Sequence, residues 1–154
     1  MDKNLIASVE DFIQMEGRSL GTSSWMLIDQ DMINRFADAT MDNQWIHIDN
    51  ERAMRDSMYH STIAHGYLTL SLIIHLLEDT FVLQNAQQII NYGIDKFTFQ
   101  NPVLVDSRIR LHVFLKSAKD LGSACMAKLF CQMEIENQEK PAFEGIITLI
   151  YNFV

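Results

Sequence analysis

An acid and an imidazole stand five residues apart in the first third of the sequence, and a glycine follows them at the start of a long apolar segment. These residues are Asp42, His47 and Gly66. A carboxylate and an imidazole at this spacing can converge on one water molecule and act as general acid and base. A backbone N–H at the start of a helix can hold a carbonyl oxygen as it gains negative charge. Together they are the parts needed to add water to a conjugated thioester, or to remove it.

The elements that precede these residues follow from hydrophobic spacing. The pattern predicts a first helix over residues 7–16 and a short strand over 25–28. Apolar residues then recur at helical spacing, which predicts an amphipathic helix over residues 30–40 with Asp29 as its N-cap. The acid and the imidazole are therefore expected in the loop that leaves this helix, at residues 42–49.

Two further helices are predicted around the glycine. Asp49 or Asn50 can cap a short helix through residues 51–54. Residues 64–78 have apolar side chains on all sides, which is typical of a helix buried in protein. The glycine at position 66 therefore lies near the start of a buried helix.

After the buried helix, apolar residues recur at every second position, which indicates strands. The predicted strands cover residues 90–99, 108–116, 125–136 and 143–153. Gly93 is expected to mark a bulge or a close approach of two backbones. An amphipathic sheet must cover its apolar face, and the buried helix is the natural cover. The predicted fold is α+β: a hot-dog arrangement in which a long central helix is wrapped by a curled antiparallel sheet of about five strands.

The composition predicts one globular domain over residues 1–154, with residues 1–20 as an N-terminal helical extension. Hydrophobic residues make up 48% of the chain and charged residues 21%. The net charge of −8, without a cluster of lysine and arginine, argues against nucleic acid as a partner and against an anionic membrane surface. The longest apolar stretch, residues 63–77, is interrupted by polar side chains and is shorter than the ~20 residues of a membrane span.

The two cysteines indicate a reducing compartment. Cys125 and Cys131 are expected on one strand, ~20 Å apart along it, which is too far for a disulfide within the chain. No signal peptide is apparent at the N-terminus. A cytoplasmic location is therefore expected.

Two motifs in this order resemble those of the MaoC-like dehydratase family, which includes (R)-specific enoyl-CoA hydratases. The first runs from Phe36 to Thr40 and continues through Asp42, His47 and Asp49; the second is Ile63-Ala64-His65-Gly66. The resemblance extends from about residue 20 to the C-terminus. The stretch Gln44-Trp45-Ile46-His47 is especially similar to the nodulation protein N branch. Hydratases of the family usually carry Asn-Pro where this chain has Gln44-Trp45.

The resemblance implies reversible hydration of trans-2-enoyl thioesters to (R)-3-hydroxyacyl thioesters, without a cofactor. His47 would take a proton from the attacking water, Asp42 would place the water and return a proton to C2, and the N–H of Gly66 would hold the thioester oxygen. Gln44, Trp45 and His65 are expected to bind substrate, an acyl-CoA or acyl-carrier thioester. A single curled sheet leaves one edge strand unpaired, so a homodimer that pairs edges across a two-fold axis is expected. The resemblance implies that the active sites lie at that interface.

Other interpretations of the same residues remain open. Asp42 can be a turn residue and His47 a packed loop residue, and Gly66 can serve close packing alone. His60 and His65 lie near the same place, but their spacing from the other acids and imidazoles matches no standard metal-ligand pattern, so no metal is expected.

Two other functions fit the same fold. The chain can be a non-catalytic acyl-CoA or acyl-carrier binding protein, a possibility that Gln44-Trp45 in place of Asn-Pro motivates. It can also be an acyl-CoA thioesterase with Asp42 as its base. For the phosphates of coenzyme A, the sequence offers one pool of basic residues: Arg52, Arg55, Lys96, Arg108 and Arg110.

Overall fold

The computed structural model describes residues 3–154. The N-terminal part holds β1 (Leu5–Ile6), α1 (Val9–Gln14), β2 (Ser19–Thr22) and β3 (Met26–Ile28). The middle part holds α2 (Gln30–Thr40), α3 (Trp45–Ile48), α4 (Asn50–Asp56), α5 (Gly66–Ser71) and α6 (Ile73–Leu77). The C-terminal part holds β4 (Val82–Leu83), β5 (Ala86–Phe99), β6 (Ser107–Asp120), β7 (Ala124–Ile135) and β8 (Phe143–Phe153).

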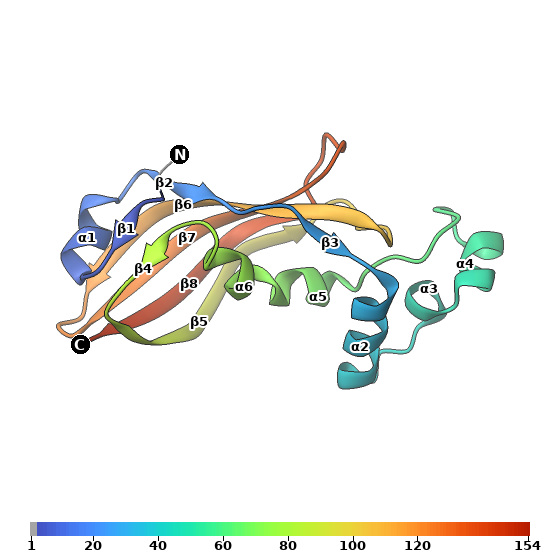
Figure 1. Cartoon of the computed structure of the whole chain (residues 1–154), viewed down its shortest axis with the longest axis horizontal. Coiled ribbons are helices and arrows are strands. Elements are labelled where there is room, and N and C mark those ends of the chain that lie inside the picture. The colour runs from blue at the N-terminus through green and yellow to red at the C-terminus, as the bar shows by residue number, and fades with distance from the viewer. Residues whose placement is uncertain (1–2) are drawn as a thin grey trace.

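The main sheet has six antiparallel strands in the order β2-β6-β7-β8-β5, and β3 also pairs with β6. The sequence predicted about five strands, and the additional one is β2, which pairs with β6 beside β3. The predicted irregularity at Gly93 is confirmed, because the register of β5 against β8 shifts between Asn91 and Gly93. The short strands β1 and β4 form a separate parallel pair at one end of the molecule (Figure 1).

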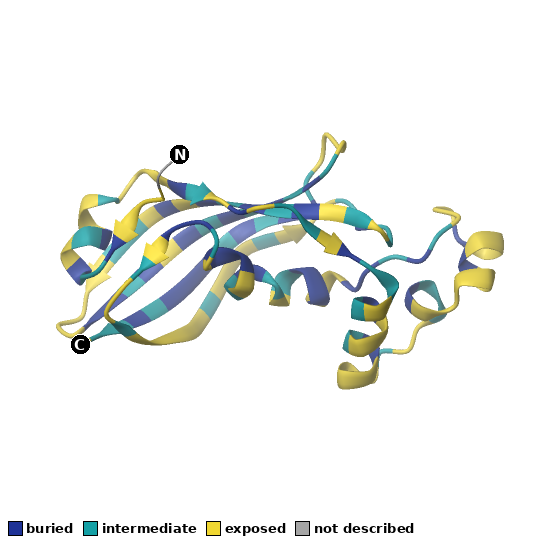
Figure 2. Cartoon of the chain, in the orientation of Figure 1, coloured by how far each residue is buried: buried dark blue, intermediate teal, exposed yellow. Residues whose placement is uncertain are grey.

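The core lies between α5–α6 and one face of the sheet. Along β6, β7 and β8 buried residues alternate with more exposed ones, as expected for a sheet with one covered face (Figure 2). Leu68, Ile73 and Leu76 from the helices belong to the same buried cluster as the inward residues of the strands. The predicted α+β hot-dog arrangement is thereby confirmed.

The central helix differs from its prediction, because it is two short helices rather than one long helix. α5 ends at Ser71 and α6 begins at Ile73. Within α5, Thr69 Oγ1 donates to the carbonyl of Gly66 and Ser71 Oγ to that of Tyr67, both at 2.7 Å. Such bonds to the preceding turn bend helices. The segment is also not buried on every side, since Tyr67 is 69% exposed.

Two other expectations need correction. The expected loop at 42–49 contains the four-residue helix α3, which is too short to show a helical period. The expected helical extension at 1–20 contains strand β1 and the start of β2 besides α1. Phe12 of α1 is fully buried and its ring lies 4.6 Å from that of Tyr151, so α1 packs against the sheet.

Other local predictions are confirmed. Asp29 caps α2, with its Oδ1 accepting from the N–H of Met32 at 2.8 Å. Asp49 caps α4 through the N–H of Arg52 at 2.9 Å. Cys125 and Cys131 are buried free thiols on β7. Within residues 3–154, no helix is long and apolar enough to cross a membrane.

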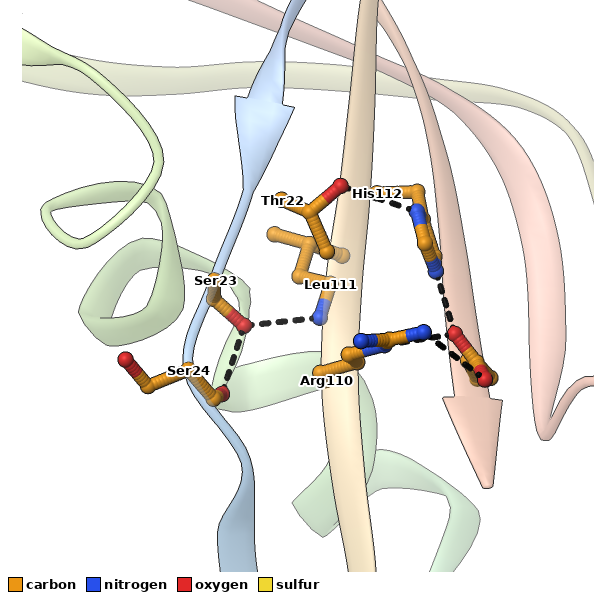
Figure 3. A network of polar contacts seen from close by, with 7 residues as sticks. Thr22, Ser23, Ser24, Arg110, Leu111 and His112 are labelled. Atoms are coloured by element: carbon orange, nitrogen blue, oxygen red, sulfur yellow. Dashed lines mark hydrogen bonds and ion pairs between the residues drawn. The ribbon is translucent and has the colours of Figure 1, made fainter. Parts of the chain in front are cut away.

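A polar network fixes β2 on β6 (Figure 3). Thr22 Oγ1 lies 3.0 Å from His112 Nδ1, and Ser23 Oγ accepts from the N–H of Leu111 at 2.8 Å. Arg110 then joins β6 to β7 through a two-pronged ion pair with Glu134. Because β3 continues from β2 along β6, this register also fixes where α2 begins, and α2 leads directly into the candidate site.

Candidate active site

The three predicted groups come from three different elements that backbone bonds hold together. Asp42 follows α2, His47 lies in α3 and Gly66 is the first residue of α5. The N–H of Ile63 donates to the carbonyl of Ile46 at 3.0 Å, which ties the chain before α5 to α3. Helices α2 and α3 lie beyond one end of α5 and of the sheet (Figure 1).

The ring of His47 has a defined orientation and a defined tautomer. His47 is 6% exposed, and its Nδ1 lies 2.7 Å from the carbonyl oxygen of Ile63. A carbonyl only accepts, so Nδ1 carries the proton and Nε2 holds a free lone pair. Burial lowers the pKa of His47 below its usual value, which keeps the ring neutral at pH 7. His47 therefore presents a general base to the site.

The backbone of His47 is held from α2. Gln30 Nε2 donates to the carbonyl of His47 at 2.8 Å, and Gln30 Oε1 accepts from Thr62 Oγ1 at 2.6 Å. This side chain links α2, α3 and the segment before α5. Sequence reasoning missed Gln30, because a glutamine in the first turn of a helix carries no pattern of its own.

Asp42 supplies an ionised carboxylate next to this base. Gln44 Nε2 donates to Asp42 Oδ1 at 3.0 Å, and this hydrogen bond holds the pKa of Asp42 below its usual value. The other oxygen, Oδ2, lies 4.0 Å from His65 Nε2. Its side chain is 40% exposed, and a carboxylate oxygen lies within 4.8 Å of a ring nitrogen of His47.

The structure places the three predicted substrate-binding residues in different surroundings. Gln44 contacts Asp42, whereas Trp45 lies beneath the guanidinium of Arg52, with 4.4 Å between the guanidinium carbon and the ring centroid. His65 is 2% exposed and stacks on His47, with 3.7 Å between ring centroids. A role for each of them in binding substrate stays a prediction.

Gly66 lies where both proposed uses of a glycine apply. As the first residue of α5, its N–H has no acceptor within the helix. A Cβ at this position would lie 2.9 Å from Cε1 of Phe99, closer than side chains tolerate. Close packing against Phe99 thus favours glycine here, and the residue is exposed and lines the cavity described below.

A cavity of about 390 Å³ joins His47 and Gly66. Its wall also includes apolar side chains from α5, from the end of β5 and from the segments around Pro102 and Ala142. Phe99 is one of several wall residues that sequence reasoning missed, because its contact with Gly66 spans 33 positions and no local pattern reports it. The wall offers a base and a backbone donor around an apolar space, and the Asp42 carboxylate lies outside the wall but within 4.8 Å of a ring nitrogen of His47.

The same residues form a group with metal-ligand chemistry. Asp42, His47 and His65 offer ligand-type atoms that all lie within 4.8 Å of one another, and among residues 3–154 this is the one group of three. Two ligand atoms on one tetrahedral zinc ion lie roughly 3.3 Å apart, given bonds of about 2.0 Å. His65 Nε2 already donates a hydrogen bond to the backbone carbonyl oxygen of Asp42 at 2.9 Å, so it has no lone pair free for a metal. The geometry is thus better suited to holding water than to holding a metal, and the expectation of no metal stays a prediction.

Comparison with known proteins identifies the family. Residues 11–128 match the family described as MaoC like domain. This chain belongs to the MaoC-like dehydratase family. Over 136 residues it is 40% identical to 3-hydroxyacyl-thioester dehydratase Z of Mycobacterium tuberculosis, covering 88% of this chain and 89% of the relative. It is 41% identical to nodulation protein N of Rhizobium meliloti over 137 residues, covering 88% and 85%.

Solved structures of low sequence identity share its fold. The (R)-hydratase from A. caviae involved in PHA biosynthesis superimposes with a TM-score of 0.71 at 19% identity, covering 87% of this chain and 94% of that one. The monoamine oxidase regulatory protein from Archaeoglobus has a TM-score of 0.76 at 17% identity, covering 100% and 99%. At these identities the likeness establishes the hot-dog fold, and the chemistry depends on the site.

Proposed function

We propose that this MaoC-like protein adds water reversibly to trans-2-enoyl thioesters and forms (R)-3-hydroxyacyl thioesters. One observation carries the proposal. The bond from His47 Nδ1 to the Ile63 carbonyl leaves Nε2 as a neutral base beside the ionised Asp42, at a cavity that also exposes Gly66. A dehydratase of 3-hydroxyacyl thioesters is among the relatives at 40% identity. The (R) configuration is proposed from the likeness to an (R)-hydratase.

The first half of the reaction builds up charge on the thioester oxygen. A water held between Asp42 and His47 attacks C3 of the enoyl group, and one of its protons passes to His47 Nε2. The electron pair of the C2–C3 double bond moves toward the carbonyl, which becomes an enolate. The N–H of Gly66 donates to that oxygen as its charge grows, and one such donor is worth about 3–4 kcal/mol of the barrier.

The second half returns the proton to C2. Asp42 is ionised, so it has no proton of its own to give. It therefore passes on to C2 the proton that His47 accepted, and the two ligand-type atoms lie within 4.8 Å of each other. The hydroxyl stays on C3, a hydrogen stays on C2, and both catalytic groups regain their starting charge.

The substitution of Gln44-Trp45 for Asn-Pro supports this chemistry rather than loss of activity. The amide of Gln44 donates to Asp42 Oδ1, so Gln44 helps to keep the Asp42 carboxylate ionised and oriented. A purely binding protein has no need of that contact. Tight binding of an acyl-CoA without hydration would favour the binding protein, and release of free thiol would favour the thioesterase.

The substrate class is an acyl thioester of coenzyme A or of a carrier protein. Of the five basic residues that could receive phosphates, four are in ion pairs with neighbouring acids: Arg52, Arg55, Arg108 and Arg110. Binding of coenzyme A phosphates by these side chains would compete with those ion pairs.

The active form is proposed to be a homodimer that pairs along β5. This strand lies at the edge of the main sheet, and it exposes large apolar side chains, including Tyr92 at 64% and Ile94 at 51%. Exposed apolar edge strands promote association, and a two-fold axis closes the contact. Because Phe99 at the end of β5 also lines the cavity, a second copy would border the site. Sedimentation of Ile94→Lys as a monomer beside a dimeric parent would support this, whereas a monomeric parent would contradict it.

Enzyme assays test the reaction directly. Loss of the enoyl ultraviolet absorbance is measured with trans-2-enoyl-CoA substrates of increasing chain length. The product is then offered to an (S)-specific 3-hydroxyacyl-CoA dehydrogenase and to an (R)-specific one. Turnover with consumption by the (R)-specific enzyme alone is expected. Absence of turnover at every chain length, on CoA and on carrier-protein thioesters, would refute the proposal.

A further inference from the structure

The side chain of His65 contacts His47 and the backbone of Asp42, and His65 directly precedes Gly66. Its ring stacks on His47 with an interplanar angle of 25°. Its Nε2 lies 2.9 Å from the backbone carbonyl oxygen of Asp42. It directly precedes Gly66, and its own carbonyl accepts from the N–H of Leu68 at 3.0 Å. These contacts link the loop after α2, helix α3 and the start of α5.

The burial of His65 favours a role other than the predicted contact with substrate. Its side chain is 2% exposed, and the cavity wall at Gly66, as built from residues 3–154, does not include it. The ring of Phe36 lies on it from α2, with 5.0 Å between centroids. His65 therefore packs behind His47 and Asp42, outside the wall of the cavity where a substrate would bind.

We propose that His65 is a positioning residue, whose Nε2–H fixes the backbone of Asp42 while its ring holds His47 in place. The inference rests on the proposed hydratase function. A carbonyl only accepts, so Nε2 carries the proton in this contact. Nδ1 is buried and has no hydrogen-bond partner among the described residues, so the contact made by Nε2 is the polar interaction that accounts for a histidine here.

Asp42 lies in a loop, although acid–base chemistry needs its carboxylate to be held in an accurate position. Asp42 follows Met41, which ends α2 in the left-handed region with φ of 61°. The loop backbone beyond it is joined to α5 by the bond from His65. Movement of a catalytic group by about 1 Å can cost 100-fold in rate. Loss of the donor is thus expected to lower kcat roughly 10- to 100-fold and to change KM less.

Three substitutions at His65 distinguish the contribution of its N–H donor from that of its ring. His65→Phe keeps a stacked ring and removes the donor. His65→Gln removes the ring and keeps an amide N–H near the place of Nε2, whereas His65→Asn places its amide near Nδ1, which has no partner. His75→Gln, at an exposed position on α6, is the matched control. Thermal unfolding of each variant shows whether it is folded before its kcat is compared.

The expected order of kcat is parent and His75→Gln together, then His65→Gln and His65→Phe, which each keep one of the two contacts, and His65→Asn lowest because it keeps neither. A role in stability alone predicts instead that kcat per folded molecule is unchanged in all variants. The proposal is overturned if folded His65→Phe keeps the parental kcat, or if His65→Gln loses as much as His65→Asn. If His65→Phe does not fold, the kcat of His65→Gln compared with that of His65→Asn still tests the role of the donor.

A second readout does not depend on turnover. It follows the hydrogen bond from His65 Nε2 to the carbonyl oxygen of Asp42 directly. His65→Phe removes this donor and should shift the carbonyl carbon resonance of Asp42 in carbon NMR, and His75→Gln should not. If the parent hydrates no enoyl thioester, the proposed function fails, and this measurement alone judges the contact. An unchanged Asp42 carbonyl resonance would then overturn the positioning role.

Discussion

Substituting alanine for Gly66 tests whether its close packing and its proposed catalytic role are linked. The new Cβ would lie 2.9 Å from Cε1 of Phe99, whereas ordinary contact begins at 3.4 Å, so the ring must retreat by 3.4 − 2.9 = 0.5 Å or α5 must move. Phe99 is 44% exposed, so the ring can give way in part. We expect a loss of about 1 kcal/mol of unfolding free energy from overpacking. A shift of this size at the N–H should lower kcat/KM about tenfold.

The double variant Gly66→Ala/Phe99→Leu gives the new methyl group room. Unfolding by urea and hydration of an enoyl-CoA are measured for the parent, both single variants and the pair. Relative to Phe99→Leu alone, the added Gly66→Ala change should then cost little in stability or in kcat/KM. The reasoning is refuted if Gly66→Ala is fully active, or if Phe99→Leu recovers stability but none of the activity.

Three further predictions concern the protonation of His47, the independence from metal and the hydrogen bond to Asp42. Because burial lowers the pKa of His47 and only the neutral ring is a base, kcat/KM should stay level around pH 7 and fall as the pH drops through a midpoint below 6.5; a midpoint above 6.5 would contradict this. Pre-incubation with a chelator should leave kcat unchanged, because no step needs a metal; loss of activity that zinc restores would show otherwise. Gln44→Leu removes the donor to Asp42 Oδ1, so the pKa of Asp42 should rise and kcat/KM should fall by up to about tenfold, whereas unchanged activity would show the contact to be incidental.

The parts of the fold that sequence predicted are those with a strong local signal. The helix over residues 30–40 with its Asp29 cap was predicted at its observed bounds, because spacing and capping agree there. Of the four long strands, β6, β7 and β8 followed from alternation. α3 and the pair β1–β4 were missed because four or two residues show no period. The break at Leu72 was missed because apolar residues continue through it, while the hydroxyls of Thr69 and Ser71 act on the backbone.

The candidate residues could be chosen from the sequence, whereas the contacts that hold them could not. Asp42, His47 and Gly66 were chosen by residue type, spacing and resemblance, and the structure brings His47 and Gly66 to one cavity with Asp42 beside them. The contacts that define their states are long-range: Ile63 sets the tautomer of His47, and Phe99 limits position 66. Such contacts depend on how separate elements pack, and one sequence contains no spacing that reports them.

The central claim is that Asp42 and His47 act as a unit on one water in enoyl thioester hydration. Its most direct test is the hydration rate of the parent, Asp42→Asn, His47→Gln and the double variant, all measured on one enoyl-CoA. Each single variant should lose roughly 10²–10⁴-fold in kcat, and the double variant should lose about as much as the more damaging single variant. Parental rates in either single variant, or losses that multiply in the double variant, would contradict the account.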